Sequence, residues 1–397
     1  MKKITIMKIL KVFGFVFLFA ASGAVGVGAG VVQHSAEKIQ KPSVDEFNED
    51  NIMVNQAVAE DEETTEMYTD IAIFGVDARN HSLGKGNRSD SIMVATINNE
   101  THDVVLTSFY RDTLVDIPGK GYDKLTHAYS YGGPELAINT LNHNFDMAIK
   151  DYVTVNFAIA EDIIDMMGGV EIEISNSEVN SINKFMVELY NEGADTDVEY
   201  LDESGMVTLT GSQAVAYART RNLKGGDYKR AKRQRTVIDA AIKKAKKTDF
   251  ATITQIINES ISNVNTSLSM DEILGLAKNV FDYNVIDSQG FPYHVKNAKT
   301  NTYAFPTQRT FVEISKCLAD DVKNLHYMLY GVGTPVMVDV NSDSEMDEDN
   351  GKANKLYGTD TPTSLETDAK TVDESKKDYE PSETVKGISE ELASRVY

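Results

Sequence analysis

The chain has 397 residues, of which 41% are hydrophobic, so it is long enough to bury a large core. Its net charge is -22, with most of the excess acid at the two ends: residues 36–70 contain eleven acidic and two basic residues, and residues 339–397 contain sixteen and seven. This acidity argues against nucleic acid as a partner, and the single cysteine, Cys317, excludes an intramolecular disulfide and is expected to be a buried thiol.

The first 32 residues have the pattern of a membrane anchor. Residues 1–11 contain four lysines, and residues 12–32 contain no charged residue. As a helix, a run of that length spans about 31 Å, which matches a hydrocarbon core of ~30 Å. Because basic residues precede the run and acidic residues follow it, we expect a single-pass type II protein of the cell membrane with its main domain extracellular. A cleaved signal peptide is the alternative, since small residues fill the second half of the run.

Two acidic, polar segments flank the predicted domain. Residues 33–69 are interpreted as a linker without fixed structure, and residues 339–397 as a disordered tail, because both contain few large apolar residues. No linker composition divides the residues between them. The sequence therefore predicts one domain over residues 70–338.

Strands and helices alternate within this domain. β-rich runs bounded by turn residues predict strands at residues 70–76, 91–97, 104–109, 152–157, 170–175 and 330–340. Apolar residues at helical spacing, together with helix end signals, predict helices at residues 134–145, 158–169, 212–220, 228–247 and 252–264. This order predicts an α/β or α+β sandwich around a central sheet.

The loop after the first predicted strand contains two acids and two bases, namely Asp77, Arg79, Arg88 and Asp90. Magnesium takes oxygen ligands and is often held by one or two carboxylates together with substrate phosphates. If the loop folds back, Asp77 and Asp90 satisfy that requirement, and the arginines suit an anion. The alternative is a solvated loop in which Asp77 caps a turn and Asp90 pairs with Arg88.

A basic cluster lies between residues 219 and 235, where eight basic residues accompany one acid. Arg230, Arg233 and Gln234 share one face near the start of a predicted helix, and the free backbone N–H groups there also favour an anion. Arginine binds phosphate oxygens bidentately, so this cluster predicts a phosphate site. Smaller polar clusters follow the third predicted strand and precede the helix at residue 134: Arg111 with Asp112, and Lys124.

Taken together, six segments resemble, in order, the motifs of the LytR–CpsA–Psr (LCP) family of cell-envelope enzymes: IFGVDAR, NRSDSIMVATIN, VVLTSFYRDTLVDIPG, DKLTHAYSYGG, LTGSQAVAYARTR and GDYKRAKRQR. An anchor helix before the domain is also the family layout. The resemblance implies a central mixed sheet sandwiched by helices, with an apolar groove for a polyprenyl chain. It also implies transfer of a glycopolymer, such as a teichoic acid or capsular polysaccharide, from an undecaprenyl-pyrophosphate carrier to peptidoglycan, assisted by Mg²⁺.

The resemblance further implies the roles of individual residues. The metal-binding acids of the family are matched by Asp77 and Asp90, and its pyrophosphate-binding bases by Arg79, Arg88, Arg111, Lys124, Arg219 and Arg221. The start of the last motif is matched by Arg230 and Gln234, with Arg233 beside them. The residues expected to take part in catalysis are Arg111, Arg230, Asp77 and Asp90. The chain departs from the family pattern at Tyr110, Thr126, His127, Lys229 and Arg235, so the shape of the acceptor side is not predicted.

Two other functions fit the same residues. A prenyl-pyrophosphate hydrolase would use water in place of a sugar hydroxyl, and a non-enzymatic transcriptional regulator would need its basic cluster in the cytoplasm, against the predicted orientation. Zinc chemistry and a serine hydrolase are not indicated, because the seven histidines have no ligand-like spacing and GxSxG is absent. The proton acceptor stays open among Asp77, Asp90 and Asp112. The residues expected to line a lipid groove are Ile138, Leu141, Ile163, Ile164, Met166 and Met167.

Overall fold

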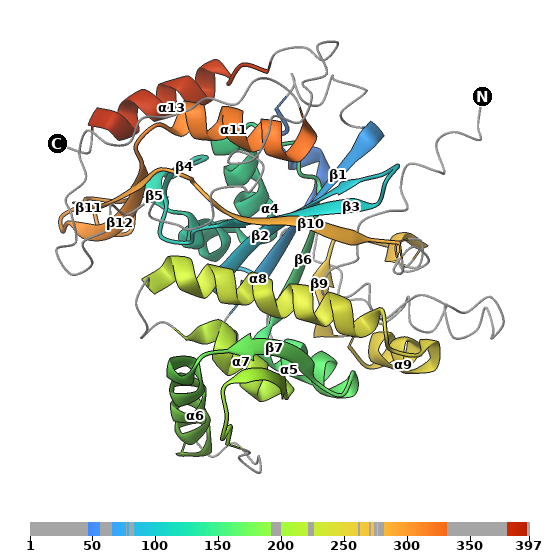
Figure 1. Cartoon of the computed structure of the whole chain (residues 1–397). Helices are drawn as coiled ribbons and strands as arrows, with labels where there is room; N and C mark the ends of the chain where they lie inside the picture. The colour runs from blue at the N-terminus through green and yellow to red at the C-terminus, as the bar shows by residue number, and fades with distance from the viewer. Residues whose placement is uncertain are drawn as a thin grey trace, which may run out of the picture.

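Two layers of helices enclose a six-stranded mixed sheet in the computed structural model of the chain (Figure 1). The structure describes residues 47–55, 66–76, 78, 83–191, 200–220, 226–260, 263–269, 271–273, 276, 282–331 and 379–394. The strand order is β10-β3-β2-β1-β6-β9, with β1 antiparallel to β2 and parallel to β6. The predicted sandwich with a central mixed sheet is therefore confirmed.

Four strands of the sheet follow the predicted apolar runs, and two were not predicted. The four are β1 (Tyr68–Val76), β2 (Ser89–Asn98), β3 (Asp103–Phe109) and β6 (Asp151–Asn156), and the two are β9 (Asn265–Thr266) and β10 (Asn284–Phe291). Successive side chains of β1 point to opposite helical layers: Phe74 contacts the ring of Tyr129 at 5.1 Å, whereas Ile73 lines a cavity on the other face. Burial on both faces explains why β1 reads as a continuous apolar run.

Each face of the sheet is covered by helices (Figure 1). One layer contains α5 (Phe157–Met166), α7 (Gly211–Arg219) and α8 (Gly226–Ala245), with α6 (Asn176–Asn191) and α9 (Phe250–Ser260) packed on it. The other contains α4 (Leu125–Phe145), α11 (Leu318–Tyr330) and α13 (Glu383–Ser394). None of the helices in the described part of the chain combines the length and the apolar character needed to cross a membrane, and residues 12–32 lie outside that part.

Three two-stranded antiparallel sheets lie beside the main sheet. They are β4 (Leu114–Ile117) with β5 (Gly121–Lys124), β7 (Val170–Ile174) with β8 (Gly205–Leu209), and β11 (Val295–Thr300) with β12 (Thr310–Ser315). β12 also bridges to the residue before β4, because Thr113 pairs with Glu313. The two hairpins β4–β5 and β11–β12 therefore lie side by side at one end of the fold (Figure 1).

Helix α4 begins nine residues earlier than the helix predicted at Pro134. The helix is broken at Gly132 and Gly133, and the φ of 67° at Gly133 is one that glycine adopts without steric cost. Pro134 then starts the second half, where its fixed φ and missing N–H are tolerated. The predicted helix is thus the second half of α4, and the first half was missed.

The structure corrects the predicted flanks in two places. Residues 47–55 were assigned to a linker without fixed structure, but Phe47 packs on Tyr152 at 4.9 Å and the Met53 amide donates to Asn139 Oδ1 at 2.7 Å. Residues 383–394 were assigned to a disordered tail, but they form α13, with Val385, Ile388 and Leu392 buried. The apolar residues recur three and four positions apart, and this spacing gives the helix a buried face despite its acidic surroundings.

Candidate functional site

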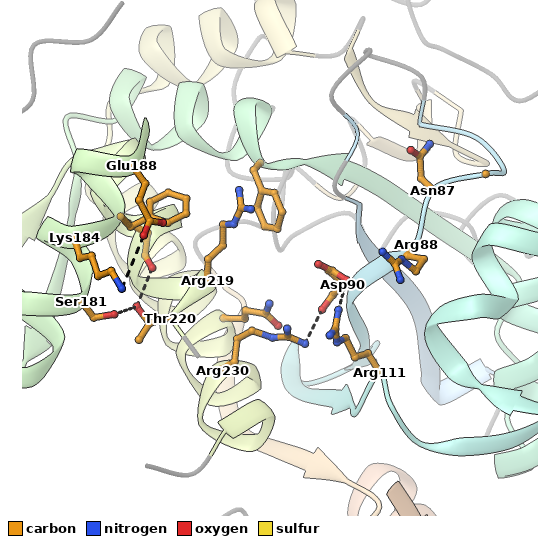
Figure 2. Close-up of a pocket in the computed structure, with 15 residues that line it drawn as sticks. Asn87, Arg88, Asp90, Arg111, Ser181, Lys184, Glu188, Arg219, Thr220 and Arg230 are labelled. Carbon is orange, nitrogen blue, oxygen red and sulfur yellow. Dashed lines mark hydrogen bonds and ion pairs between the residues drawn. The ribbon is translucent and has the colours of Figure 1, made fainter. Parts of the chain in front are cut away.

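A polar pocket opens where the start of β2 meets the end of β3 (Figure 2). β2 and β3 are antiparallel with Met93 opposite Ser108, and continuing that register brings Asp90 opposite Arg111. Arg111 Nη1 lies 2.5 Å from Asp90 Oδ1, which makes an ion pair. The pocket has a volume of about 720 Å³, and the predicted site residues that line it are Arg88, Asp90, Arg111, Arg219, Arg230 and Gln234.

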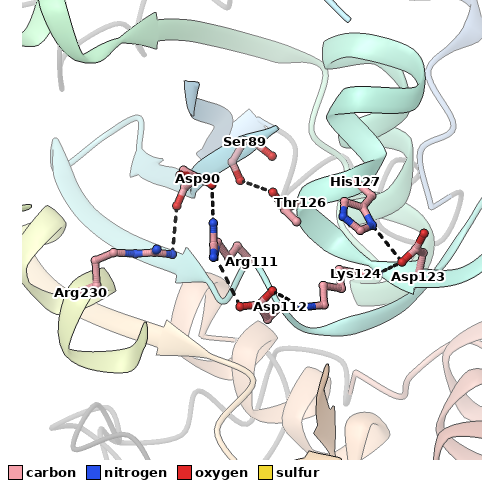
Figure 3. A network of polar contacts seen from close by, with 9 residues as sticks. All are labelled: Ser89, Asp90, Arg111, Asp112, Asp123, Lys124, Thr126, His127 and Arg230. Carbon is pink, nitrogen blue, oxygen red and sulfur yellow. Dashed lines mark hydrogen bonds and ion pairs between the residues drawn. The ribbon is translucent and has the colours of Figure 1, made fainter. Parts of the chain in front are cut away.

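Arg111 is held between two acids (Figure 3). Besides its ion pair with Asp90, its Nε lies 3.6 Å from Asp112 Oδ2, and Lys124 Nζ donates to Asp112 Oδ1 at 2.8 Å. Burial opposes ionisation of Asp112, but the hydrogen bond from Lys124 and the nearby charges of Arg111, Lys124 and Arg230 outweigh it and lower the pKa of Asp112. Asp112 is therefore an ionised group that fixes the direction of the Arg111 guanidinium.

The first turns of α8 supply two residues to the pocket. Arg230 is only 3% exposed, and its Nη2 donates to the backbone carbonyl of Asp90 at 3.3 Å. Gln234 lies one turn further along the same face and also lines the pocket. Arg233 does not line it: its Nε donates to Glu178 Oε1 at 2.8 Å, and its Nη1 donates to the carbonyl of Thr220 at 3.2 Å. Lys124 does not line the pocket either, because its Nζ donates to Asp112 Oδ1.

The guanidinium of Arg219, at the end of α7, lies between two phenylalanine rings. Its central carbon is 4.7 Å from the ring centroid of Phe157 on α5 and 4.9 Å from that of Phe185 on α6. Both distances are within the range of a cation–π contact. The two rings restrict where Arg219 points, so its charge is presented to the pocket in a defined direction.

Helix α6 contributes a wall of the pocket that was not predicted from the sequence. Ser181, Lys184, Phe185 and Glu188 line the wall opposite Asp90. These residues belong to none of the six motif segments, and only the amphipathic spacing of α6 marks one face of that helix. Three predicted site residues, Asp77, Arg79 and Arg221, lie outside the residues that the structure describes.

An apolar cavity adjoins the polar pocket, beneath α5, α7 and α8. It has a volume of about 110 Å³, and the apolar residues along it include Ile73, Met93, Ile163, Ile164, Met167 and Val237. Phe157 and Gln234 line both the cavity and the pocket. The predicted groove residues Ile163, Ile164 and Met167 are therefore in place. The predicted residues Ile138, Leu141 and Met166 do not line it: Ile138 and Leu141 are buried in α4 on the opposite face of the sheet, and Met166 packs against the core.

Asp90 has the chemistry of a single carboxylate ligand for magnesium. Its side chain lines the pocket, and its Oδ1 accepts from Arg111. A carboxylate has two oxygens with about four acceptor sites, so an ion pair with arginine is compatible with binding a cation. The group of three possible metal ligands found among the described residues, His294, Cys317 and Asp321, is remote in sequence from every pocket residue.

A model of the LytR_cpsA_psr family matches residues 29–320 of the chain. The chain is 36% identical over 219 residues to the polyisoprenyl-teichoic acid–peptidoglycan teichoic acid transferase TagU of Oceanobacillus iheyensis, across 53% of this chain and 62% of that protein. Its match to TagU of Enterococcus faecalis spans 64% of that protein, so the chain covers less than two thirds of both. It is 29% identical to TagT of Bacillus subtilis over 314 residues, across 77% of this chain and 91% of that protein.

Solved structures with the same architecture include TagT bound to LI-WTA. That structure superposes with a TM-score of 0.52 at 26% identity, across 68% of this chain and 93% of that chain. Protein gbs0355 from Streptococcus agalactiae superposes with a TM-score of 0.54 at 23% identity, which supports the fold alone. Both comparisons agree with the mixed sheet and the two helical layers described above.

Proposed function

The chain belongs to the LytR_cpsA_psr family, and from this premise we propose that it transfers a glycopolymer, as its phosphate, from an undecaprenyl-pyrophosphate carrier to a hydroxyl of peptidoglycan. The observation that carries the proposal is the junction of a cationic pocket with an apolar cavity, where Phe157 and Gln234 line both. A diphosphate joined to a hydrocarbon chain has this same division of charge and apolar surface. The names of the relatives TagU and TagT support the same substrate class.

The bond changes follow from the charge of the donor. The acceptor hydroxyl oxygen attacks the phosphorus that carries the glycopolymer, the bond from that phosphorus to the bridging oxygen breaks, and prenyl phosphate leaves. The hydroxyl proton passes to a base. Phosphoryl transfer depends chiefly on positioning and on stabilising charge, and Arg88, Arg111, Arg219 and Arg230 line the pocket for that purpose.

Asp90 is the proton acceptor that we propose. Among Asp77, Asp90 and Asp112, Asp90 is the acid within the described residues whose side chain lines the pocket. Asp112 is not among the residues that line the pocket, and the hydrogen bond from Lys124 and the nearby positive charges lower its pKa, which makes it a weak base. Its role is to orient Arg111, which in turn is ion-paired with Asp90.

Magnesium is proposed to bind at Asp90 of β2, with Asp77, which lies outside the described residues, as the second carboxylate that the family resemblance implies. When bound, the ion would neutralise charge on the diphosphate and on the departing prenyl phosphate. The arginines of the pocket are placed to bind the remaining phosphate oxygens and to orient the donor.

The proposed location follows from the N-terminal sequence. Four lysines and the uncharged residues 12–32 support a single membrane anchor with the domain outside the cell. Both substrates of the proposed reaction, the lipid-linked glycopolymer and peptidoglycan, are on that side of the membrane.

The test uses the full chain in detergent with a prenyl-pyrophosphate-linked saccharide and un-crosslinked peptidoglycan oligomers, with and without magnesium. Mass spectrometry should detect a phosphodiester-linked adduct. Arg111→Ala should lower the rate about 100-fold or more, the usual effect of removing one well-placed charge-stabilising group. Lys243→Ala is the matched control, because Lys243 is 70% exposed and pairs only with Asp239 among the contacts found. Release of saccharide phosphate without an adduct would instead identify a hydrolase.

A further inference from the structure

The hairpin β11–β12 exposes a group of aromatic side chains, which we call the aromatic platform: Tyr303, Phe305 and Phe311. They are 49%, 43% and 42% exposed. Among the described residues, Tyr200 is the other aromatic side chain that is exposed to this degree. Large aromatic side chains are costly to leave in water, so three on one short hairpin point to a binding surface.

The platform is held rigidly against β5 and α4. The Tyr303 amide donates to the carbonyl of Tyr122 at 2.9 Å, and the Ala304 amide donates to Asp123 Oδ2 at 2.9 Å. The same Oδ2 accepts from the hydroxyl of Tyr131 at 2.6 Å, and the Tyr131 ring contacts Tyr303 edge-on at 5.3 Å. A surface fixed in advance loses little conformational freedom when a ligand binds.

The platform is continuous with the charged network behind the pocket. Lys124 Nζ lies 2.8 Å from Asp112 and 5.8 Å from the ring centroid of Phe311. On β12, the amide of Glu313 donates to the carbonyl of Asp112 at 2.9 Å, and Phe311 is two residues away on the same face of that strand. Through Lys124 and Asp112 the platform is connected to Arg111, which lines the pocket, whereas the apolar cavity joins the pocket at Phe157 and Gln234.

The hairpin is basic although the chain as a whole has a net charge of -22. Residues 295–315 contain Lys296, Lys299 and Arg309, and their one acid, Glu313, is buried at 2% exposure. Lys120 adds a further positive charge 5.6 Å from the ring of Tyr303. Flat aromatic faces bordered by ammonium groups suit sugar rings that carry carboxylates. They do not suit a purely apolar chain.

We propose that Tyr303, Phe305 and Phe311 form the binding platform for the acceptor, a glycan strand whose peptide carboxylates pair with the bordering lysines. The axial C–H groups of a sugar ring stack on the negative face of an aromatic ring. The inference rests on the proposed function and adds the surface that presents the acceptor hydroxyl from the Arg111–Asp112 side. The donor lipid then enters from the apolar cavity, so the two substrates approach the pocket from different sides.

The first measurement is transfer kinetics of the full chain in detergent. Tyr303→Ala and Phe311→Ala should each raise the KM for un-crosslinked peptidoglycan oligomers about 2- to 12-fold, the range for one aromatic contact, with kcat and the donor KM unchanged. Tyr303→Phe keeps the ring and should restore the acceptor KM. The control is Ile286→Ala, because Ile286 is 50% exposed at the far end of β10. An acceptor KM that is unchanged in both alanine variants would overturn the proposal.

A binding measurement keeps the inference separate from the reaction. Saturation-transfer NMR on the full chain should show contact with sugar-ring protons of the soluble oligomer, lost in the Tyr303→Ala/Phe311→Ala double variant and kept in Ile286→Ala. If the wild-type chain shows this pattern but no transfer, the proposed function fails and the platform stands. No sugar signal from the wild-type chain refutes the platform.

Insertion of the β11–β12 hairpin into the membrane is the outcome that would replace acceptor binding as the role of the platform. In nanodiscs, a fluorophore at Phe305→Cys in a Cys317→Ser background should not be quenched by lipids that carry quenchers in their acyl chains. Quenching there would assign the three aromatic side chains to the bilayer surface instead of to a glycan.

Discussion

The guanidinium of Arg219 lies over the ring of Phe157, with 4.7 Å between the central guanidinium carbon and the ring centroid. The same ring lines both the polar pocket and the apolar cavity. Phe157 therefore has two roles: its ring orients a positive charge that lines the pocket, and it forms part of the boundary where the diphosphate of the proposed donor meets its hydrocarbon chain.

Replacing Phe157 by leucine should weaken donor binding more than acceptor binding. Leucine keeps an apolar side chain at the cavity but removes the π face beneath Arg219. Cation–π contacts are worth about 0.5–2 kcal/mol, so the donor KM should rise roughly 2- to 30-fold in transfer assays. Phe157→Tyr retains the ring and is the control. Equal losses in Phe157→Leu and Phe157→Tyr would contradict the role given to the ring.

Gly211→Ala should destabilise the pocket wall. Gly211 begins α7, and a Cβ there would lie 2.2 Å from the carbonyl oxygen of Glu161 on α5, which is too close for either backbone to keep its place. We expect a loss of about 1–3 kcal/mol in the free energy of unfolding, measured by urea denaturation, with weaker donor binding because α7 carries Arg219.

The matched control is Gly387→Ala in α13. A Cβ at Gly387 meets nothing within 4 Å, and alanine is preferred to glycine in a helix interior by about 0.5–1 kcal/mol. This variant should therefore be slightly more stable than the wild type. Loss of stability in Gly387→Ala, or none in Gly211→Ala, would show that the packing at these two helices is not as described.

The C-terminal helix should contribute measurably to the stability of the domain. Leu392 is 1% exposed and belongs to the core that α13 forms with α4 and α11. Leu392→Ala should cost about 2–5 kcal/mol, as for other buried leucines, whereas Glu390→Ala on the exposed face should be neutral. Thermal unfolding of both variants distinguishes them, and equal midpoints would mean that α13 is not docked in solution.

His326 should make the domain less stable as the pH falls from 6.5 toward 4. Its ring stacks on Tyr379 at 3.9 Å, and burial lowers its pKa to about 4, against about 6.5 in an unfolded chain. Between these values the unfolded state binds a proton and the folded state does not, so the free energy of unfolding falls by up to about 1.4 kcal/mol per pH unit. Urea unfolding of the wild type and His326→Gln at pH 7, 6 and 5 should show their difference change with pH.

Several carboxyls, among them Glu161 with a pKa that burial raises to about 7, act in the opposite direction, which is why the comparison needs a variant. Burial raises the pKa of Asp70 and of Asp151 to about 6, so each protonates in the folded state first and adds stability as the pH falls through 6 toward 4. All are present in the wild type and in His326→Gln, and their effect cancels in the difference. His102→Asn is the control, since the φ of 62° at His102 is one that asparagine tolerates.

Local signals predicted the strands and helices whose residues repeat at a regular period. β1, β2, β3 and β6 were found because they are continuous or alternating apolar runs. The first half of α4 was missed because it ends at Gly132 and Gly133, a pair that reads as a break. α13 was not predicted, although Val385, Ile388 and Leu392 have helical spacing. The prediction of a disordered tail rested on the composition of residues 339–397 as a whole, and that average hides the periodicity of a short segment.

Six of the residues that line the pocket were predicted from motifs, but their grouping depends on tertiary contacts. The pairing of Asp90 with Arg111 follows from the β2–β3 register, and in principle that register can be inferred from the sequence. Nothing in the sequence indicates that Arg233 turns toward Glu178, away from Gln234. The cluster of His294, Cys317 and Asp321 was also unpredictable, because its members come from different elements and have no motif spacing.

The parallel pairing of β10 with β3 has a consequence for the time that the chain takes to fold. The contact between Gln289 and Thr107 joins residues 182 positions apart, and a ribosome that adds about 5–20 residues per second needs about 9–36 s to make the intervening chain. Throughout that interval the outer edge of β3 is without its native neighbour. An unpaired strand edge is a template for association, so the risk of self-association is greatest before synthesis is complete. A slower ribosome lengthens the interval during which β3 lacks β10 as its neighbour.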